Sequence, residues 1–491
     1  MLRRRHLLAG AAGLALGLPA VRRARAAWGT WPEEHADLAL PPERTAARVL
    51  ELYAYGGLCP WDTFYCVPEW GLGRSRYLYA FGEAALAARL AACGLPSELA
   101  RPFAEDAAGA LVHLGPWAAP LWDRPDLLAR TRVVVLRHDQ FPHSTAVPLA
   151  LTGARLGQPA LAGTGAAVER HLRERDGRVD PRTVVVHPGS LSRLDNVQSA
   201  LSVGLHPAAA RPLELSLDRA AQLLQLLARP ATADRRDAHD AVVAALAERT
   251  RARLRDRTGA PLRAPEFVAW QAVDAARRRA PELAGLFPPS VFALGSGEAC
   301  GESNLSTPAL GLRVATHLLT RPDPFQYALW VDAGLRPTLD GGHDTHRDHL
   351  RWAPVNYTHT LRQLAAAINA PGEADPDKLD LDDTLVAITT EFGRTPQRED
   401  HREGLGHWPA GYVAVLIGGP IDAPAVAGAI DPATGAASDW ATPAELRMAL
   451  LVALGVYPFD RASFDASAVR GAADPRAALA RLRAHLLGVA P

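Results

Sequence analysis

The stretch DDTLVAITTEFGRT, from Asp382 to Thr395, is an apolar run that ends in a carboxylate and an arginine. Its centre suits a buried strand, and Glu391 and Arg394 follow where that strand would end. Two β-branched runs repeat this form, TRVVVLRHDQF at 131–141 and RTVVVHPGSL at 182–191. Short apolar strands that end in polar loops are typical of a buried, mostly parallel sheet. We therefore expect an α/β fold with helices on both faces of such a sheet.

Three further segments fit the same sheet: RTAARVLELYAYGGLCPWDTF at 44–64, PFQYALWVDAG at 324–334 and AGYVAVLIGGPI at 410–421. The first half of the 44–64 segment would also suit a helix. Ala, Leu and Arg recur at helical spacing around 205–290, which predicts a helical insertion, and the tail from Thr442 is also expected to be helical. In open α/β sheets ligands bind beyond the carboxyl ends of the strands. The polar clusters that follow the strands should therefore meet in one crevice.

The chain begins with MLRRRHLLAGAAGLALGLPAVRRARAA, a basic start followed by an apolar run and a small-residue cleavage site. The pair Arg4-Arg5 predicts a twin-arginine signal peptide over residues 1–27, with the mature domain at 28–491. Its partner would be the twin-arginine export machinery, and the mature protein would be periplasmic or secreted. The alternative is a membrane anchor, but the apolar run has about 15 residues where a span needs about 20. No later segment predicts a membrane span in the mature chain.

Charge and cysteine content exclude several classes of protein. Lys+Arg and Asp+Glu both total 53, so no excess of positive charge predicts a nucleic-acid partner. The four cysteines would meet an oxidising compartment, where one or two disulfides could form. Cys59 and Cys66 are near enough in sequence to close a small loop, but spacing leaves the pairing open. No CxxC supports a thiolate zinc or redox centre, and no GxGxxG after a strand supports a nicotinamide or flavin enzyme.

The segment HDTHRDH, His343 to His349, places several possible metal ligands within seven residues. Asp344 and His346 are two residues apart, so in an extended backbone both side chains point to the same side and could bind one zinc or manganese ion. The alternative is a histidine-rich loop without metal.

A second group follows the strand at 384–389. Glu391 could reach the crevice, and Gly393 would allow a tight turn that aims Arg394 at an anionic substrate or at a carboxylate. His407 returns sixteen residues after Glu391, just before Trp408. The alternatives are a structural Glu391–Arg394 ion pair and a His407 that packs beside the tryptophan.

A third group lies in HDQFPHSTAVPLALTG, at 138–153. His143 and Ser144 would open a helix, at an end where backbone N–H groups favour anions. Ser144 could be a nucleophile if a metal lowered its pKa. It could equally cap the helix.

These blocks, together with GGLCPWDTF, GGHDTHRDH, TEFGRTP and GHWPAGYVAVLIGGPI, resemble a bacterial family known as domain of unknown function 1501. That family is in turn similar to the sulfatases and to alkaline phosphatase. The resemblance implies an alkaline-phosphatase-like three-layer sandwich and one or two divalent ions such as zinc, manganese or calcium. The metal ligands that it implies are Asp62, Asp344, His346, Glu391 and His407, and the catalytic residues are His143, Ser144 and Arg394.

The implied function is an exported, metal-dependent hydrolase of a small anionic ester of phosphate or sulfate. The chain departs from the pattern at two points. Phe392 cannot bind a metal, and Gly406 stands before His407 where relatives usually have an aspartate, with Asp400 and His401 as nearby candidates for compensation. The alternative is therefore a non-catalytic periplasmic binding or assembly protein with a degenerate metal site.

Overall fold

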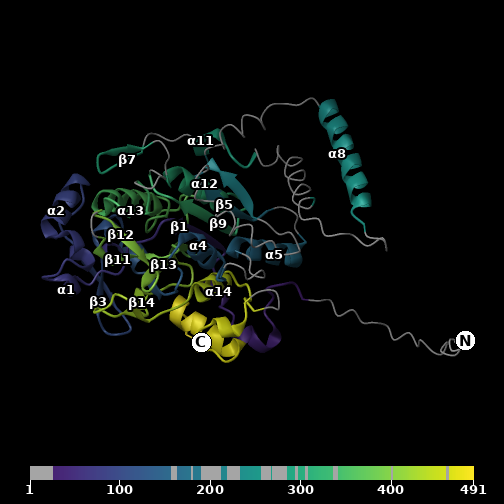
Figure 1. The fold of residues 1–491 in the computed structure, drawn as a ribbon. Coiled ribbons are helices and arrows are strands. Elements are labelled where there is room, and N and C mark those ends of the chain that lie inside the picture. Colours follow the sequence, from purple (N-terminus) through teal and green to yellow (C-terminus); the bar gives the residue numbers. More distant parts are fainter. Residues whose placement is uncertain are drawn as a thin grey trace, which may run out of the picture.

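The computed structural model describes residues 26–155, 163–177, 181–188, 212–217, 233–255, 267, 285–292, 297–304, 308–335, 341–399, 402–459 and 464–490. The expected signal peptide lies almost wholly outside these ranges, and so does most of the expected insertion at 205–290. Within that insertion the structure describes β6 (Leu213–Ser216), α8 (Ala233–Arg253) and the start of α11 (Pro289–Phe292). Helix α8 is of the predicted kind and is drawn at the outer edge of the molecule in Figure 1.

An eight-stranded sheet with the order β14-β4-β13-β10-β1-β9-β5-β6 forms the centre of the fold. Strand β13 is antiparallel to both of its neighbours, and the other paired strands run parallel. The strands other than β6 are β1 (Arg48–Ala54), β4 (Thr131–Leu136), β5 (Thr183–His187), β9 (Tyr327–Asp332), β10 (Thr384–Thr389), β13 (Tyr412–Gly418) and β14 (Ala425–Ala427). The predicted α/β class is confirmed, as a mixed sheet.

Alternate residues of each central strand pack into two separate hydrophobic cores, one on each face of the sheet. In β1, Leu50 and Leu52 belong to one core and Val49 and Tyr53 to the other. Helices α12 (Pro308–Thr320) and α13 (His349–Ala366) cover the first core, and α4 (His143–Thr152), α5 (Thr164–Asp176) and α14 (Pro443–Ala453) cover the second (Figure 1). The uninterrupted apolar runs in the sequence reflect this burial on both faces.

One charged residue interrupts the apolar strand β1. Glu51 is fully buried and accepts hydrogen bonds from Arg447 at 2.7 Å and from Thr389 at 2.6 Å. Burial opposes ionisation of this carboxyl, but the guanidinium of Arg447 outweighs it and lowers the pKa of Glu51. The pair ties α14 to the middle of the sheet.

The other described elements include short helices and two-stranded hairpins. The short helices are α1 (Pro68–Gly71), α2 (Glu83–Ala92), α3 (Pro125–Leu128) and α15 (Pro475–Arg481), and the hairpins are β2 (Arg101–Glu105) with β3 (Leu111–Leu114), β7 (Gly297–Ala299) with β8 (Glu302–Asn304), β11 (Gly393–Arg398) with β12 (Leu405–Trp408), and β15 (Ala429–Ile430) with β16 (Ala437–Asp439). The β11–β12 hairpin follows β10 directly and pairs Arg394 with His407. It therefore returns His407 to the carboxyl end of the sheet.

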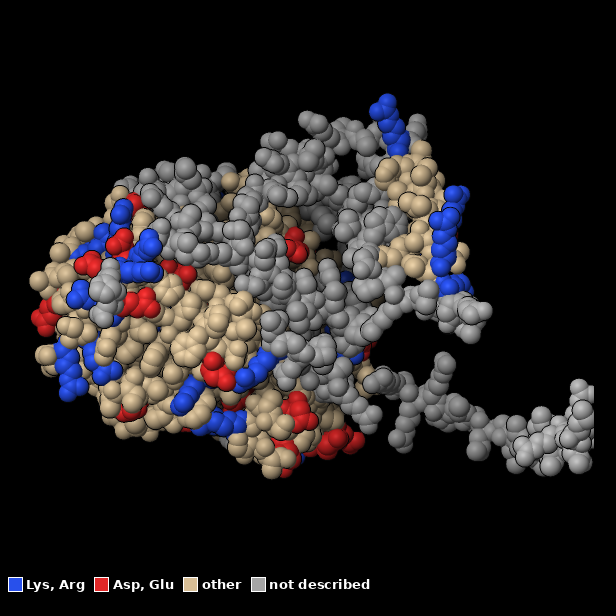
Figure 2. Space-filling model, in the orientation of Figure 1, with Lys and Arg blue, Asp and Glu red and all other residues tan. Residues whose placement is uncertain are grey.

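One disulfide, Cys93–Cys300, joins the end of α2 to the turn between β7 and β8. Cys59 and Cys66 are buried and unpaired, so the small loop between them is not closed. None of the helices in the described ranges has the length and hydropathy of a membrane span. On the face seen in Figure 2, acidic and basic side chains are interspersed over the body of the molecule.

Candidate metal centre

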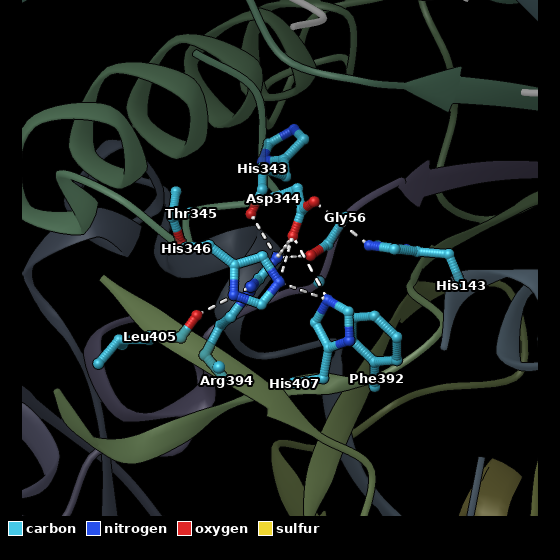
Figure 3. Close-up of polar contacts among 12 residues, drawn as sticks. Gly56, His143, His343, Asp344, Thr345, His346, Phe392, Arg394, Leu405 and His407 are labelled. Carbon is cyan, nitrogen blue, oxygen red and sulfur yellow. Dashed lines mark hydrogen bonds and ion pairs between the residues drawn. The ribbon is translucent and has the colours of Figure 1, made fainter. Parts of the chain in front are cut away.

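A cluster of polar side chains lies at the carboxyl ends of the strands, as the sequence predicts. His143 opens α4 after β4, Asp344 and His346 lie in the loop between β9 and α13, and His407 lies on β12. Figure 3 shows Asp344 between the histidine side chains. Segments that are far apart in the sequence thus meet at one edge of the sheet.

Three atoms of this cluster have the spacing of metal ligands. Oδ1 of Asp344 lies 3.3 Å from Nε2 of His346 and 3.5 Å from Nε2 of His407, and the two nitrogens are 2.8 Å apart (Figure 3). With bonds of about 2.0–2.1 Å, the ligand atoms of a tetrahedral zinc ion lie about 3.3 Å from one another. The two distances from Oδ1 match this spacing, and the two nitrogens are closer together, so a divalent ion would fit among the three atoms once the two imidazole rings move slightly apart.

The outer nitrogens of both histidines face hydrogen-bond acceptors. Nδ1 of His407 lies 2.8 Å from the carbonyl oxygen of Phe141, which can only accept, so Nδ1 carries the proton. Nδ1 of His346 lies 3.3 Å from a carboxylate oxygen of Glu399. Both Nε2 lone pairs therefore point toward Asp344, which is the arrangement of histidines that bind metal ions.

Residues 338–461 match the family model described as "Protein of unknown function (DUF1501)". The matched segment contains Asp344, His346, Glu391, Arg394 and His407, so the family part of the resemblance is confirmed there. No curated protein and no solved structure gives a significant match to the chain.

His143 approaches the other oxygen of the same aspartate. Its Nε2 lies 3.3 Å from Oδ2 of Asp344, and its Nδ1 lies 2.8 Å from Oε1 of Glu391. One ligand atom from each of His143, Asp344 and His407 lies within 4.8 Å of the others. Burial opposes the charged form of this ring, but the two carboxylates outweigh it and raise the pKa of His143 to about 9. His143 is thus a cation in the metal-free protein and a fourth ligand candidate once it has lost its proton.

The carboxylate of Glu391 supports His143 and, within the described residues, forms no hydrogen bond or ion pair with His346 or His407. It is fully buried, and its Oε1 accepts from the backbone N–H of Gly56 at 2.7 Å as well as from His143. Phe392 follows it and stacks on His407 with ring centroids 4.0 Å apart. Phe392, which cannot bind a metal, therefore forms an apolar wall behind His407, which can.

Arg394 holds the loop of Asp344 in place. Its fully buried guanidinium donates to Oδ1 of Asp344 at 2.7 Å and to the carbonyl oxygens of His343 and Leu405 at 3.1 and 3.0 Å. The histidines around Asp344 and this guanidinium outweigh the burial of the carboxyl and hold the pKa of Asp344 well below its ordinary range. The expected contact of Arg394 with a substrate anion does not agree with this geometry, because its side chain has no exposed surface.

Glu399 occupies the space near Gly406. A Cβ atom placed on Gly406 would lie 2.4 Å from Oε1 of Glu399. A carboxylate thus lies near position 406, where the resemblance expects one, but it belongs to Glu399, the residue that follows β11, which sequence reasoning missed. Spacing could not reveal this, because it depends on how the two strands pair. Asp400 and His401 lie outside the described residues.

Two expected site residues are not joined to this cluster. Ser144 is exposed at the start of α4, and it forms no hydrogen bond or ion pair with the cluster in the described part of the chain. Asp62 hydrogen-bonds His349 at 2.8 Å and groups with it and Cys59. The resemblance implied that Asp62 and Asp344 bind metal together, but the turn after β1 carries Asp62 to His349, the first residue of α13.

The cluster is open to solvent. The side chains of Asp344, His407 and His346 are 13%, 17% and 29% exposed. A cleft of about 520 Å³ lies alongside, lined by Phe141 at the cluster and by Arg137, Arg155 and Trp440 farther out. A metal ion here would keep a coordination position that a small molecule can reach.

Proposed function

We propose that the protein is an exported, metal-dependent hydrolase that acts on a small phosphate or sulfate ester. The observation that supports it best is the convergence of Asp344, His346 and His407 at a partly exposed point. A closed structural site would be buried on all sides, whereas a catalytic site keeps an open position.

A bound zinc or manganese ion would polarise an ester oxygen and make water at the site more acidic. Asp344 supplies the negative charge that holds such an ion, and Arg394 fixes the direction of its carboxylate. Phe141 and Glu399 orient the two histidines through their Nδ1 atoms. Phe392 keeps water from the rear of His407.

Water is the nucleophile in this proposal. Ser144 is exposed and makes no hydrogen bond to the cluster within the described residues, so no base is in position to activate it. The cleft beside Phe141 offers room for the organic part of an ester, and Arg137 on its wall favours an anionic molecule, whereas the charge of Arg155 is balanced by Asp139.

We also propose the alkaline-phosphatase-like arrangement for the fold. Its support is the order of strands around β1, the helices on both faces and the site at the carboxyl ends. For the periplasmic or secreted location, support comes from the leader in the sequence and from the Cys93–Cys300 disulfide, since such bonds persist in oxidising compartments.

A non-catalytic binding or assembly protein is the second candidate. It is favoured by Glu391, which is tied to His143 and Gly56 and forms no hydrogen bond or ion pair with His346 or His407 within the described residues, and by Phe392, which fills the place of a ligand. Such a protein would retain the fold and bind an anion without turnover.

Turnover separates the two candidates. The mature protein is assayed with nitrophenyl phosphate and nitrophenyl sulfate, after removal of metal and again after addition of zinc or manganese. We expect metal-dependent hydrolysis of one of the two esters, with loss of activity in His407→Ala and none in the surface control His239→Ala. A protein that binds metal and hydrolyses neither ester would support the second candidate.

A further inference from the structure

Away from the open cluster, a second group of possible ligands is completely enclosed. One ligand atom from each of Cys59, Asp62 and His349 lies within 4.8 Å of the others, and all three residues are buried. They come from two segments, the turn that follows β1 and the first residue of α13.

The local backbone puts Cys59 and Asp62 on the same side. Residues Pro60–Asp62 form a 3-10 helix that Cys59 precedes. Because this helix has about three residues per turn, side chains at positions i and i+3 are aligned. The thiol and the carboxylate therefore face His349 together.

The geometry differs from a nucleophilic relay of cysteine, histidine and aspartate. In such a relay the thiol and the carboxylate occupy opposite nitrogens of the imidazole. Here Nε2 of His349 faces Oδ2 of Asp62 at 2.8 Å, and Nδ1 is engaged by the hydroxyl of Thr345 at 2.6 Å. Since Thr345 holds the opposite nitrogen, Cys59 and Asp62 share one side of the ring, as ligands of one ion do.

A buried oxygen without an N–H or O–H donor points to a missing cation. Oδ1 of Asp62 is buried and accepts no hydrogen bond from an N–H or O–H group in the described residues, and the thiol of Cys59 interacts with this carboxylate. Buried oxygens without such donors are rare in folded proteins, and an unseen ion is one of the recognised explanations. The hydroxyl of Thr345 can accept from Nδ1–H of His349, which frees Nε2 to bind the ion.

We propose that Cys59, Asp62 and His349 form a second, closed metal site that takes a thiophilic divalent ion, Zn²⁺ in the first place. Thiolate, imidazole and carboxylate are the three ligand types of protein zinc sites, and a thiolate disfavours calcium and magnesium. The second carboxylate oxygen or one enclosed water completes the coordination.

The closed site would position the open one. Thr345 lies between Asp344 and His346 in the chain and turns the opposite way, toward His349. The chain turns here, because the backbone N–H of Thr345 donates to the carbonyl oxygen of His343 at 2.9 Å. An ion at the closed site would thus fix the loop that presents Asp344 and His346, whether or not the protein is a catalyst.

Cobalt substitution tests the site without an activity assay. Apoprotein is titrated with Co²⁺, and absorption is followed in the near ultraviolet, where a thiolate bound to cobalt gives an intense charge-transfer band. We expect the band in the wild type and in His407→Ala, and its loss in Cys59→Ser. Cys66→Ser is the matched control, because Cys66 is also buried and unpaired but lies outside the cluster.

Metal content gives a second readout. We expect about two ions per chain in the zinc-loaded wild type and about one in either Cys59→Ser or His407→Ala. Absence of the cobalt–thiolate band from the wild type would overturn the closed site even if a variant fails to fold. So would a band that Cys66→Ser removes and Cys59→Ser retains. Failure of ester hydrolysis alone would leave the band unchanged.

Discussion

The two ligand clusters differ in access to solvent more than in composition. Asp344, His346 and His407 are partly exposed, whereas Cys59, Asp62 and His349 are enclosed between β1 and α13. Both depend on the loop at 343–349, in which Asp344 and His346 point to the open cluster and Thr345 and His349 to the closed one. Both clusters contain a carboxylate and imidazole, but only the closed one has a thiol, and burial assigns exchange with solvent to one cluster and rigidity to the other.

The largest expected effect tests the open cluster. His407→Ala should lower metal-dependent hydrolysis by about 10³-fold, or about 4 kcal/mol, because metal ions contribute several kcal/mol to such reactions. Stability should change little, because the side chain lies at a partly exposed edge. Steady-state kinetics and urea unfolding on the same preparation measure both. Equal loss of stability and activity would contradict an exchangeable site.

The buried ion pair of Glu51 and Arg447 lies outside both clusters, and we use it as the reference for the effect of a buried charge on stability. Glu51→Gln should reduce the free energy of unfolding by about 3–5 kcal/mol, because it leaves Arg447 buried without its counter-ion. The folded-state pKa of Glu51 is lowered, so its contribution is complete above the unfolded value near 4.5 and is lost as the pH falls through the folded value.

The measurement is urea unfolding from pH 7 down to pH 3. The wild type should lose stability below about pH 4.5, and Glu51→Gln should lose less over the same range. Metal content of the folded protein should be the same in both. Parallel pH curves would show that Glu51 does not account for this part of the acid sensitivity.

A change in the closed cluster should affect the stability of the fold more than the rate of hydrolysis. His349→Ala should lower the free energy of unfolding by about 2–3 kcal/mol, because it opens a cavity beside Phe81 and leaves Asp62 without its hydrogen bond. Thermal unfolding with and without a chelator measures this. We expect the chelator to destabilise the wild type and to have a smaller effect on the variant, while His113→Ala serves as a histidine control outside both clusters.

Variants of Glu399 test whether its carboxylate orients His346 in the open cluster. Glu399→Ala should weaken metal binding by about 10-fold to 100-fold, which is the usual effect of removing a carboxylate that orients a ligating histidine. Adding Gly406→Asp to this variant should recover part of the loss, because the two positions share one space. Calorimetric titration with zinc gives the affinities. No recovery would show that the carboxylate of Glu399 has another role.

We expect the smallest effect at Ser144, which the sequence predicted as a possible nucleophile. Ser144→Ala should change hydrolysis by less than about 2-fold, since the exposed hydroxyl of Ser144 forms no hydrogen bond with a cluster residue in the described part of the chain. Rapid-mixing assays of product release give the comparison. A loss of activity near that of His407→Ala would require a serine mechanism.

Local patterns in the sequence predicted the strands well. Runs such as Val133–Val135 and Val184–Val186 are too apolar and β-branched for any place but a sheet covered on both faces, and the meeting of Asp344, His346 and His407 follows from where their segments end. The direction in which individual side chains point could not be predicted from local sequence patterns. Burial of Arg394, the turn that takes Asp62 to His349 and the approach of Glu399 to Gly406 all arise from tertiary packing.

Cysteine pairing illustrates the same limit. Cys59 and Cys66 looked suited to a short loop, yet the disulfide joins Cys93 and Cys300 across 207 residues. Their proximity comes from the packing of α13 against both α2 and β7, which no spacing in the sequence records.

Anomalous diffraction from crystals of the zinc-loaded protein would show whether the open cluster binds an ion. We expect a peak about 2.0–2.2 Å from Oδ1 of Asp344 and from Nε2 of both His346 and His407. A well-ordered crevice with no peak among these three atoms would contradict this expectation.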